Sequence, residues 1–184
     1  MQYKYKFLIP IIFLFLGCSS TSSYYILSDI KPQKLYKHMY LSIGVEKVEV
    51  PKYLFKRELA VATTDNKITF DAYSQWAEDM DEALTRRVIG TLQKLYSNPN
   101  IYPYPWGVDK QPRYKLHINI TRFIAKGGYV YIDANYRIED TKTQRQHSYL
   151  YSNHILLKSN DADTIVQTMD SAIEYLIKDI AKKI

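Results

Sequence analysis

Strict alternation of apolar and polar residues is clearest in the middle of the chain. In the segment 113–120, RYKLHINI, polar residues separate four apolar ones: Tyr114, Leu116, Ile118 and Ile120. The segment 129–138 repeats this pattern, with Val130, Ile132, Ala134, Tyr136 and Ile138 in phase. A period of two is typical of a strand with one buried face. Because Gly127-Gly128 separates the two runs, they predict a β-hairpin with one face in water.

Four other segments carry strand patterns. Residues 24–27 are short and rich in tyrosine, and residues 145–157 form a longer run with less regular phase. The segment 41–50 changes phase near Glu46-Lys47, which predicts a bulge, and Pro51 ends it because proline lacks a backbone N–H. The segment 59–70 predicts a hairpin that turns at residues 65–67.

Two segments have the helical period instead. Residues 74–96 place an apolar residue every three or four positions: Trp76, Met80, Leu84, Val88, Leu92 and Leu95. Residues 161–183 do the same with Ile165, Val166, Met169, Ile173, Leu176 and Ile180. We expect Asn160 to cap the second helix, with Asp163 three residues later. In the first helix acidic residues precede basic ones, an order that suits the helix dipole.

The order of these elements is strands, helix, strands, helix. Residues 24–184 are long enough for one domain with its own core, and no repeat or linker divides them. The sequence therefore predicts a single α+β domain. We expect an antiparallel-rich sheet with the two amphipathic helices packed on one face.

The N-terminus has the parts of a secretory signal. Lys4 and Lys6 precede the ten-residue apolar run FLIPIIFLFL, which is too short to span a bilayer and contains Pro10. Gly17-Cys18 follows, and Cys18 is the one cysteine of the chain. The stretch resembles a bacterial lipobox, although Phe15 stands where leucine is usual. It predicts a lipoprotein signal peptide over 1–17 and acylation of Cys18; the alternative is a plain secretory signal.

Acylation would determine where the protein resides. A single fatty chain holds a protein only marginally, whereas the two or three chains of a bacterial lipoprotein hold it firmly. Ser19 and Ser20 follow Cys18 without an aspartate, which resembles an outer-membrane address. Residues 18–23 are then the acylated cysteine and a short flexible tether on the periplasmic face of that membrane.

Composition narrows the classes of partner. Loss of Lys4 and Lys6 with the leader leaves 23 basic and 19 acidic residues, a net charge of +4. This charge could favour anionic lipid headgroups or an acidic partner, but the basic residues are dispersed and form no run. We expect no nucleic-acid partner because of the location outside the cytoplasm. Tyrosine is abundant, with 18 residues, which suits a sheet-rich domain or a contact surface for lipid, glycan or protein.

The sequence contains no recognisable catalytic motif. The G-x-S-x-G, P-loop, H-E-x-x-H and Rossmann patterns are missing, and the four histidines have no metal-binding spacing. Glu78 and Glu82 lie in the acidic first half of a predicted amphipathic helix, where a solvated face is the simpler interpretation. We expect a protein that is not an enzyme and binds no metal or cofactor.

A set of ordered motifs is more specific. These are VEVPKYL (48–54) with Arg57, QWAEDM (75–80), Arg86-Arg87, YPYPW (102–106), RYKLHINITRF (113–123) and the strand after the double glycine. In this order the chain resembles the PqiC-like lipoproteins, auxiliary components of ABC-type transport systems, over residues 24–184. One departure is Asp79, where the family usually has proline.

The resemblance implies a function and partners. Such a protein is a periplasmic domain anchored in the outer membrane by its N-terminal acyl chains. It assists an MCE-domain protein and inner-membrane transporter components in moving lipids, which supports envelope integrity. The sequence leaves open the lipid, the direction of transport and whether the protein forms a homo-oligomer.

Several residues are candidates for particular roles. Pro51, Tyr53, Leu54 and Arg57 form a candidate partner contact, because tyrosine and arginine are favoured at interfaces; the alternative is that Tyr53 and Leu54 only cap the core. Trp76 and Trp106 are candidate core anchors. Arg122 falls on the apolar phase of its strand and is a candidate ion-pair partner for Glu78.

Two other functions fit the sequence. A lipid- or glycan-binding module would place tyrosines around a concave site. A lipoprotein of outer-membrane assembly would have a similar sheet with two helices, but the V-x-V-P-x-Y-L and W-A-E signatures argue against it.

Overall fold

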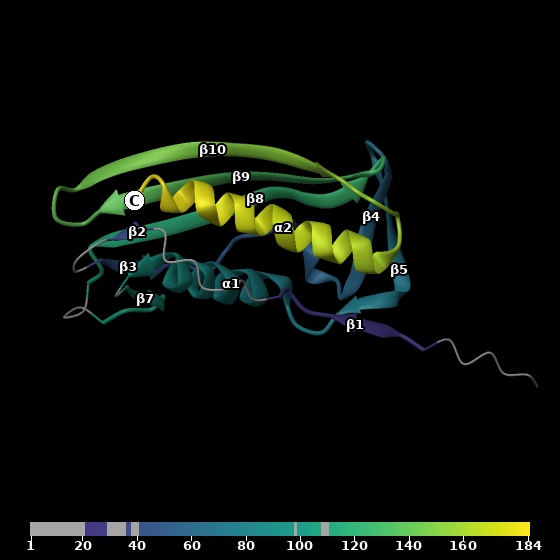
Figure 1. Ribbon diagram of the computed structural model, residues 1–184, viewed down its shortest axis with the longest axis horizontal. Helices are drawn as coiled ribbons and strands as arrows, with labels where there is room; N and C mark the ends of the chain where they lie inside the picture. Colours follow the sequence, from purple (N-terminus) through teal and green to yellow (C-terminus); the bar gives the residue numbers. More distant parts are fainter. Residues whose placement is uncertain (1–20, 29–35, 38–40, 98, 108–110) are drawn as a thin grey trace, which may run out of the picture.

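The computed structural model describes residues 21–28, 36–37, 41–97, 99–107 and 111–184, which form a mixed β-sheet with two α-helices (Figure 1). The large sheet contains eight strands: β1 (Ser23–Tyr25), β3 (Ser42–Val45), β4 (Glu58–Thr64), β5 (Lys67–Trp76), β7 (Asn100–Pro103), β8 (Tyr114–Lys126), β9 (Tyr129–Asp140) and β10 (Arg145–Leu156). A small parallel pair joins β2 (Tyr36–Lys37) to β6 (Tyr96–Ser97). The helices are η1 (Lys52–Phe55), α1 (Met80–Leu95) and α2 (Ala162–Ala181).

The long strand β8 organises the sheet. One edge of β8 pairs antiparallel with β9 along its whole length, and β9 pairs antiparallel with β10. The other edge pairs in parallel with β3 near Tyr114 and with β4 near Ala125. Further parallel pairs join β3 to β7 and β1 to β5. The α+β class is confirmed, but the sheet is mixed, and the prediction of an antiparallel-rich sheet was wrong.

The error has a physical cause. Alternation along a strand reports which face is buried, but it does not report which neighbour the strand takes or in which direction. Hairpins such as β8–β9 are local and antiparallel, whereas β3 reaches β7 only after the crossover through β4, β5 and α1. Crossovers of that length are what parallel pairing requires.

The predicted hairpins are present. Gly127 and Gly128 have φ angles of 56° and 81° between β8 and β9, the left-handed values that a tight two-residue turn needs and that glycine adopts easily. The β4–β5 hairpin turns at Asp65-Asn66, and β10 pairs with β9 in continuous register.

Arg122 follows an irregularity in β8. The register with β9 shifts between Ile120 and Arg122, so one extra residue enters β8 at Thr121. The buried positions accordingly change parity, from Ile120 to Phe123 and Ala125. Arg122 therefore lies on the exposed side of the strand, although simple alternation from Ile120 assigns it to the buried side.

The segment 41–50 also differs from its prediction. β3 ends at Val45, and the chain rejoins β8 at one isolated bridge between Glu49 and Asn119. The phase change near Glu46-Lys47 marks an interrupted ladder, where the prediction had a bulge in a continuous strand.

Both helices begin later than predicted. Residues 74–76 stay in β5 because Ser74, Gln75 and Trp76 pair with β1, so α1 begins at Met80 with Asp79 as its N-cap residue. The N-cap of α2 is Asp161 and not Asn160: its carboxylate accepts a hydrogen bond from the Thr164 backbone N–H over 2.8 Å. A cap must lie at the last extended residue, which is Asp161, one position after the predicted one.

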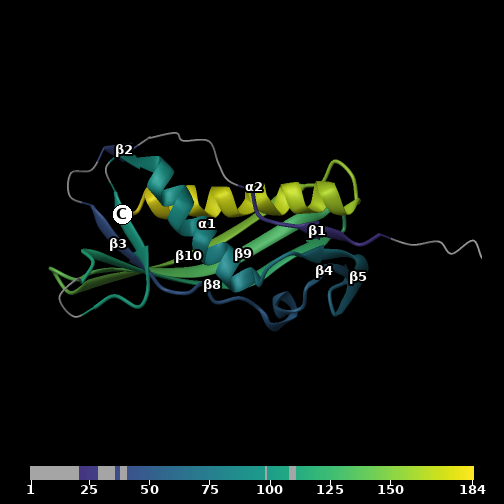
Figure 2. The same ribbon diagram turned by 90° about the horizontal axis from the view of Figure 1, so that it is seen from below.

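The core lies between the sheet and the helices. Helix α2 lies along β9 and β10, and α1 packs against β7 and α2 (Figure 2). The largest fully buried side chains include Leu84 and Leu92 of α1 and Phe123 and Tyr136 of the sheet. Within the described ranges, neither helix has the length and apolar character that crossing a membrane requires.

Candidate functional site

The predicted signal peptide, residues 1–17, and Cys18 lie outside the described residues. The chain enters the domain at β1, where the Tyr25 hydroxyl donates a hydrogen bond to Asp163 Oδ1 of α2 over 2.8 Å. The Ala77 backbone N–H also donates to the Tyr25 carbonyl over 2.8 Å. The N-terminal end of the domain is therefore fixed to both β5 and α2.

The predicted contact loop is partly built into the domain. Pro51 precedes η1, and its carbonyl accepts a hydrogen bond from the Leu54 backbone N–H. Leu54 is only 3% exposed. The Phe123 backbone N–H donates a hydrogen bond to Tyr53 Oη over 2.8 Å, and burial raises the pKa of the Tyr53 hydroxyl. Tyr53 and Leu54 thus attach the loop to β8, which matches the alternative that they cap the core.

Arg57 joins this loop to the start of α1. One guanidinium nitrogen donates to the Ala77 carbonyl and the other to Asp79 Oδ1, both over 3.2 Å. About half of the Arg57 side chain remains exposed. The segment QWAEDM, which contains Ala77 and Asp79, is therefore held against the loop by the arginine that belongs to the same set of motifs.

The proposed pair between Arg122 and Glu78 is not formed. Arg122 Nε lies 2.6 Å from Asp133 Oδ2 on β9, and its guanidinium stacks over the Tyr131 ring at 4.4 Å. Glu78 instead pairs with Arg86. The extra residue in β8 explains the error, since it turns Arg122 to the face of the sheet opposite the helices.

The two tryptophans have different environments. Trp76 is 2% exposed and belongs to the core, as predicted. Trp106 is half-buried and lies outside the core cluster, so its prediction as a core anchor was wrong. Its Nε1–H donates to Gln111 Oε1 over 3.0 Å, and its ring lies against Gly44 of β3. Tyr104 meets it edge to face at 4.9 Å between ring centroids.

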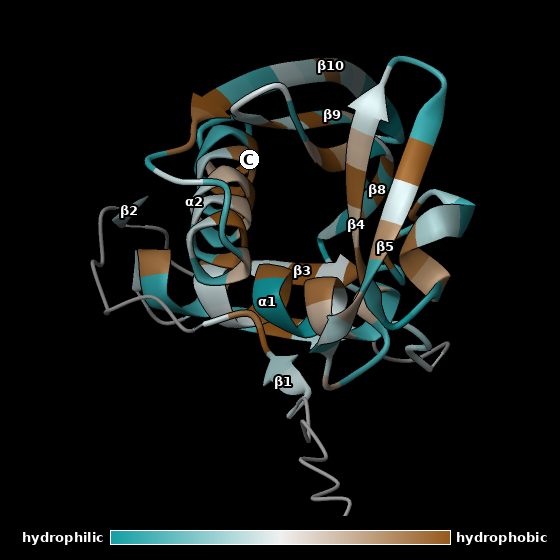
Figure 3. Cartoon of the chain, turned by 90° about the vertical axis from the view of Figure 1, so that its right-hand side faces the viewer, coloured by the Kyte–Doolittle hydropathy of each residue, from teal (hydrophilic) through white to brown (hydrophobic). Residues whose placement is uncertain are grey.

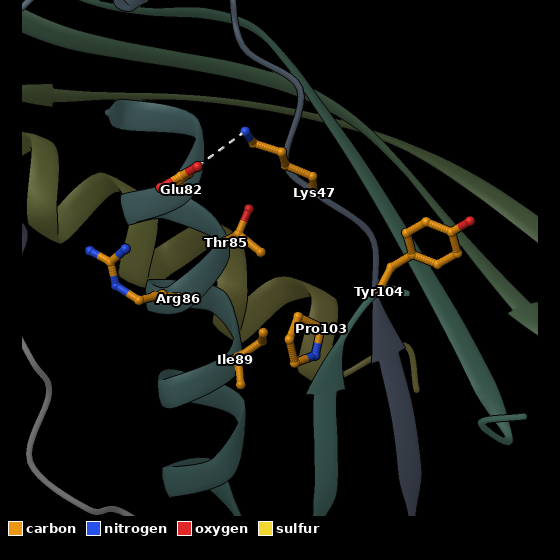
Figure 4. A pocket seen from close by; sticks show the side chains of 7 residues that line it. All are labelled: Lys47, Glu82, Thr85, Arg86, Ile89, Pro103 and Tyr104. Carbon is orange, nitrogen blue, oxygen red and sulfur yellow. Dashed lines mark ion pairs between the residues drawn. The ribbon is translucent and has the colours of Figure 1, made fainter. Parts of the chain in front are cut away.

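Residues of two of the motifs, Arg86 and the Pro103-Tyr104 part of YPYPW, line a groove beside α1 (Figure 4). Residues from three separate segments line it: Lys47 after β3, Glu82, Thr85, Arg86 and Ile89 of α1, and Pro103 and Tyr104 at the end of β7. We call it the α1 groove. Its volume is about 290 Å³, and it is open to solvent.

Hydrogen bonds and ion pairs fix the walls of the α1 groove. Thr85 Oγ1 donates to the Asp81 carbonyl over 2.7 Å and accepts from the Val48 backbone N–H over 2.9 Å. Lys47 Nζ lies 2.8 Å from Asp81 Oδ2 and 3.6 Å from Glu82 Oε1. The hydrogen bond with Asp81 raises the pKa of Lys47, so the ammonium stays charged. The loop after β3 is therefore stapled to the first turns of α1.

The chemistry of the α1 groove suits the contact of a protein side chain. Ile89, Pro103 and the Tyr104 ring provide apolar surface, and paired charges surround it. An apolar centre with a polar rim is the usual anatomy of a protein interface. Among the described residues, no group of three or more His, Cys, Asp and Glu side chains could hold a metal ion.

Sequence reasoning missed most of this groove. Lys47 appeared only as part of a phase change, and Thr85 lies on the polar side of its helix with no distinguishing neighbour. The one available signal was that Arg86-Arg87 and YPYPW belong to one set of motifs. The sequence alone gave no reason to place them side by side.

A second hollow is lined by residues of α2, β10 and β2, three of which are tyrosines. It is lined by Tyr36, Tyr151, Asn153, Tyr175, Lys178, Asp179 and Lys182, and its volume is about 480 Å³. Asp179 accepts a hydrogen bond from the Tyr136 hydroxyl over 2.6 Å, so this carboxylate is tied to the sheet. The hollow, which we call the tyrosine hollow, has the polar and aromatic lining that a glycan would need.

Comparisons with known proteins agree on the family and the fold. The family model described as "ABC-type transport auxiliary lipoprotein component" matches residues 25–181. The crystal structure of an uncharacterized protein covers 89% of this chain and 98% of its own, at 20% identity and a TM-score of 0.75. That of a Xanthomonas campestris protein covers 87% and 93%, at 15% identity and a TM-score of 0.72. No curated protein matches the sequence.

Proposed function

Because the chain belongs to the family of ABC-type transport auxiliary lipoprotein components, we propose that it is a non-catalytic adaptor in an envelope lipid-transport system. Membership in this family implies an envelope-associated, lipid-anchored protein that assists ABC-type transport. The finer assignment is our proposal: Cys18 carries the acyl chains, the domain lies on the periplasmic face of the outer membrane, and its partner is an MCE-domain protein.

One observation carries this proposal. Arg86, Pro103 and Tyr104, which belong to two of the motifs that carry the resemblance, line the α1 groove. Beside it, Arg57 binds Asp79 of the QWAEDM segment. Arg57 holds the loop, Thr85 holds the segment after β3, and Tyr104 is left 59% exposed at the rim. An exposed tyrosine above a rigid, charge-bordered groove is a typical centre for a protein contact.

The predicted contact residues enter the proposal in two ways. Pro51, Tyr53 and Leu54 hold the loop in place, because Tyr53 is bound to β8 and Leu54 is buried in the core. Arg57 presents the exposed half of its side chain beside the first turn of α1. Arg57 and Tyr104 are the residues we expect the partner to touch.

Site-specific photocrosslinking tests the proposal. A photoreactive phenylalanine analogue at Tyr104 should crosslink to the MCE-domain protein in cells that express both. The matched control is the same analogue at Leu150, which is 87% exposed on β10 and should give no such product. If Tyr104 yields no crosslink to the MCE-domain protein or any other transporter component while the acylated chain is present, the adaptor assignment fails.

The tyrosine hollow favours a second candidate, a glycan-binding module. Its three tyrosines, one each from β2, β10 and α2, line the hollow together with the polar groups of Asn153 and Asp179. If this is the function, a soluble envelope glycan fragment should bind the protein, and Tyr175→Ala should weaken binding where Tyr24→Ala does not. Equal binding by both variants would exclude the hollow.

A further inference from the structure

Exposed apolar side chains gather at one end of the molecule. The described residues include ten large hydrophobic side chains that are exposed, and six of them lie on β1, η1, β5 or the residue after β1: Tyr24, Ile26, Phe55, Ile68, Phe70 and Tyr73. We call these six residues the tether-side surface. The strands β1, β4 and β5 lie together at this end, away from the C-terminus (Figure 1).

The strand register places these residues on the outer side of the sheet. Leu59 faces the core, and its direct partner on β5 is Asp71, which shares that side of the sheet. Because side chains alternate along a strand, Phe70 and Ile68 face outward. The register with β4 shifts between Asp71 and Gln75. Tyr73, within this stretch, is 57% exposed, and Trp76 beyond it faces the core. Figure 3 views this end and shows hydrophobic positions along β5.

The other members of the surface adjoin this face. Tyr24 pairs with Gln75 and shares its outward side, while its neighbour Tyr25 points inward with Trp76. Phe55 precedes Lys56, whose ammonium group lies 4.6 Å above the Phe70 ring. The result is an exposed surface of tyrosine, phenylalanine and isoleucine residues beside a lysine, the composition found where proteins meet a membrane interface.

The length of the tether identifies what covers this surface. Only five Cα-to-Cα steps separate Cys18 from Ser23, so the two residues are at most about 17 Å apart however the chain runs. A domain of this length has a radius of gyration of about 15 Å, so its diameter exceeds the greatest distance between Cys18 and Ser23. Ser23 pairs with Ser74, next to Tyr73. A bilayer that holds the acyl chains of Cys18 must lie close to this end of the domain.

We propose that the tether-side surface rests on the bilayer that carries the anchor, with Tyr24, Phe70 and Tyr73 in its interfacial layer. This inference rests on the proposed acylation of Cys18. The bonds from Tyr25 to Asp163 and from β1 to β5 prevent Ser23 from moving away, so the short tether orients the whole domain. The α1 groove is then held at a defined angle to the membrane.

Single-cysteine fluorescence tests this orientation. Because Cys18 is the one cysteine and is consumed by acylation, a cysteine introduced elsewhere provides the single thiol for a dye. The acylated full-length variants Phe70→Cys, Tyr73→Cys and Leu150→Cys are labelled and reconstituted into phosphatidylethanolamine and phosphatidylglycerol vesicles that contain brominated lipid. Dyes at Phe70→Cys and Tyr73→Cys should be quenched at least about threefold more than the dye at Leu150→Cys.

The controls separate this inference from the proposed function. Mass spectrometry of the N-terminal peptide reports acylation. An unmodified Cys18 would contradict the proposed lipid anchor, and with it this part of the proposed function. If the protein is acylated and vesicle-bound but all three dyes are quenched equally, the orientation alone is wrong. If the Tyr73→Cys dye is shielded from solvent in detergent, where no lipid is present, a second protein chain covers the surface. That result also overturns the inference. A dye at Phe55→Cys should lose its quenching when Phe70→Asp and Tyr73→Asp are added.

Discussion

Arg87 and Asp170 form an ion pair between α1 and α2, with 3.0 Å between Arg87 Nη2 and Asp170 Oδ1. Their side chains are 3% and 16% exposed, whereas the neighbouring Arg86 is 58% exposed. The Ser28 hydroxyl, in the segment after β1, also donates a hydrogen bond to Asp170. One carboxylate therefore connects both helices and the N-terminal segment.

Removal of Arg87 should strongly destabilise the domain. Arg87→Ala leaves the Asp170 carboxylate without its buried partner, and we expect the free energy of unfolding to fall by about 3 to 5 kcal/mol. Arg86→Ala is the matched control and should lower it by less than about 1 kcal/mol, because exposed pairs contribute little. Urea denaturation measures both. If both variants lose the same free energy of unfolding, the buried ion pair contributes no more to stability than the exposed one.

Tyr53→Phe tests the attachment of η1 to β8. The substitution leaves the Phe123 backbone N–H without its acceptor in a partly buried position, so we expect a loss of about 1 to 2 kcal/mol. Tyr104→Phe removes a hydroxyl from an exposed ring and should change stability by less than about 0.5 kcal/mol. Thermal denaturation of the two variants gives the comparison. A stable Tyr53→Phe variant would contradict the role assigned to this hydroxyl.

Gly44→Ala tests the contact between β3 and the YPYPW segment. A Cβ at position 44 would lie 2.6 Å from Pro112 Cγ and 2.7 Å from Trp106 Cζ3, so the Trp106 ring must move. We expect a loss of about 1 to 3 kcal/mol together with a change in tryptophan fluorescence. At Gly107 an added Cβ meets nothing within 4 Å, so Gly107→Ala should leave both measurements unchanged.

The N-cap of α2 should make stability depend on pH in the acid range. Hydrogen bonds from Ser159 and Thr164 lower the pKa of Asp161 from 3.8 to about 2. Because the folded-state pKa is the lower one, the stabilisation is complete above about pH 5 and is lost as the pH falls toward 2. The stability difference between the wild type and Asp161→Ala should shrink over this range.

Asp161→Asn provides the control for this titration. The amide oxygen can still accept the Thr164 hydrogen bond but carries no titrating proton, so its advantage over Asp161→Ala should be nearly constant with pH. Denaturation curves at several pH values would show it. A wild-type difference that stays constant down to about pH 2 would contradict the assigned shift in pKa.

Local periodicity was sufficient for part of the fold. The strands β8 and β9 and the body of α2 could be predicted, because each depends on one buried face or one apolar stripe. The turn at Gly127-Gly128 could be predicted because glycine adopts the positive φ angles it needs. The same pattern misled where a neighbour decided the outcome. Trp76 fits the helical stripe of α1, yet pairing with β1 keeps it in β5.

The remaining differences depend on contacts between distant segments. The extra residue at Thr121 turns Arg122 outward, and simple alternation cannot reveal it. The α1 groove needs Lys47, Thr85 and Tyr104 in one place, and only the tertiary fold brings them together. The motifs pointed to Arg86 and the YPYPW segment, but only the structure shows that these residues lie beside Lys47 and Thr85.

The order of the strands has a consequence for biosynthesis. β3 is among the first strands to be made, but its partners β7 and β8 come much later in the chain. A chain that stops before Tyr114 has no β8 to join β3 and β4. A chain that stops before Asp163 also lacks the acceptor for the hydrogen bond of the Tyr25 hydroxyl. Assembly of this domain must therefore wait until α2 has been synthesised, because α2 holds the segment nearest the tether.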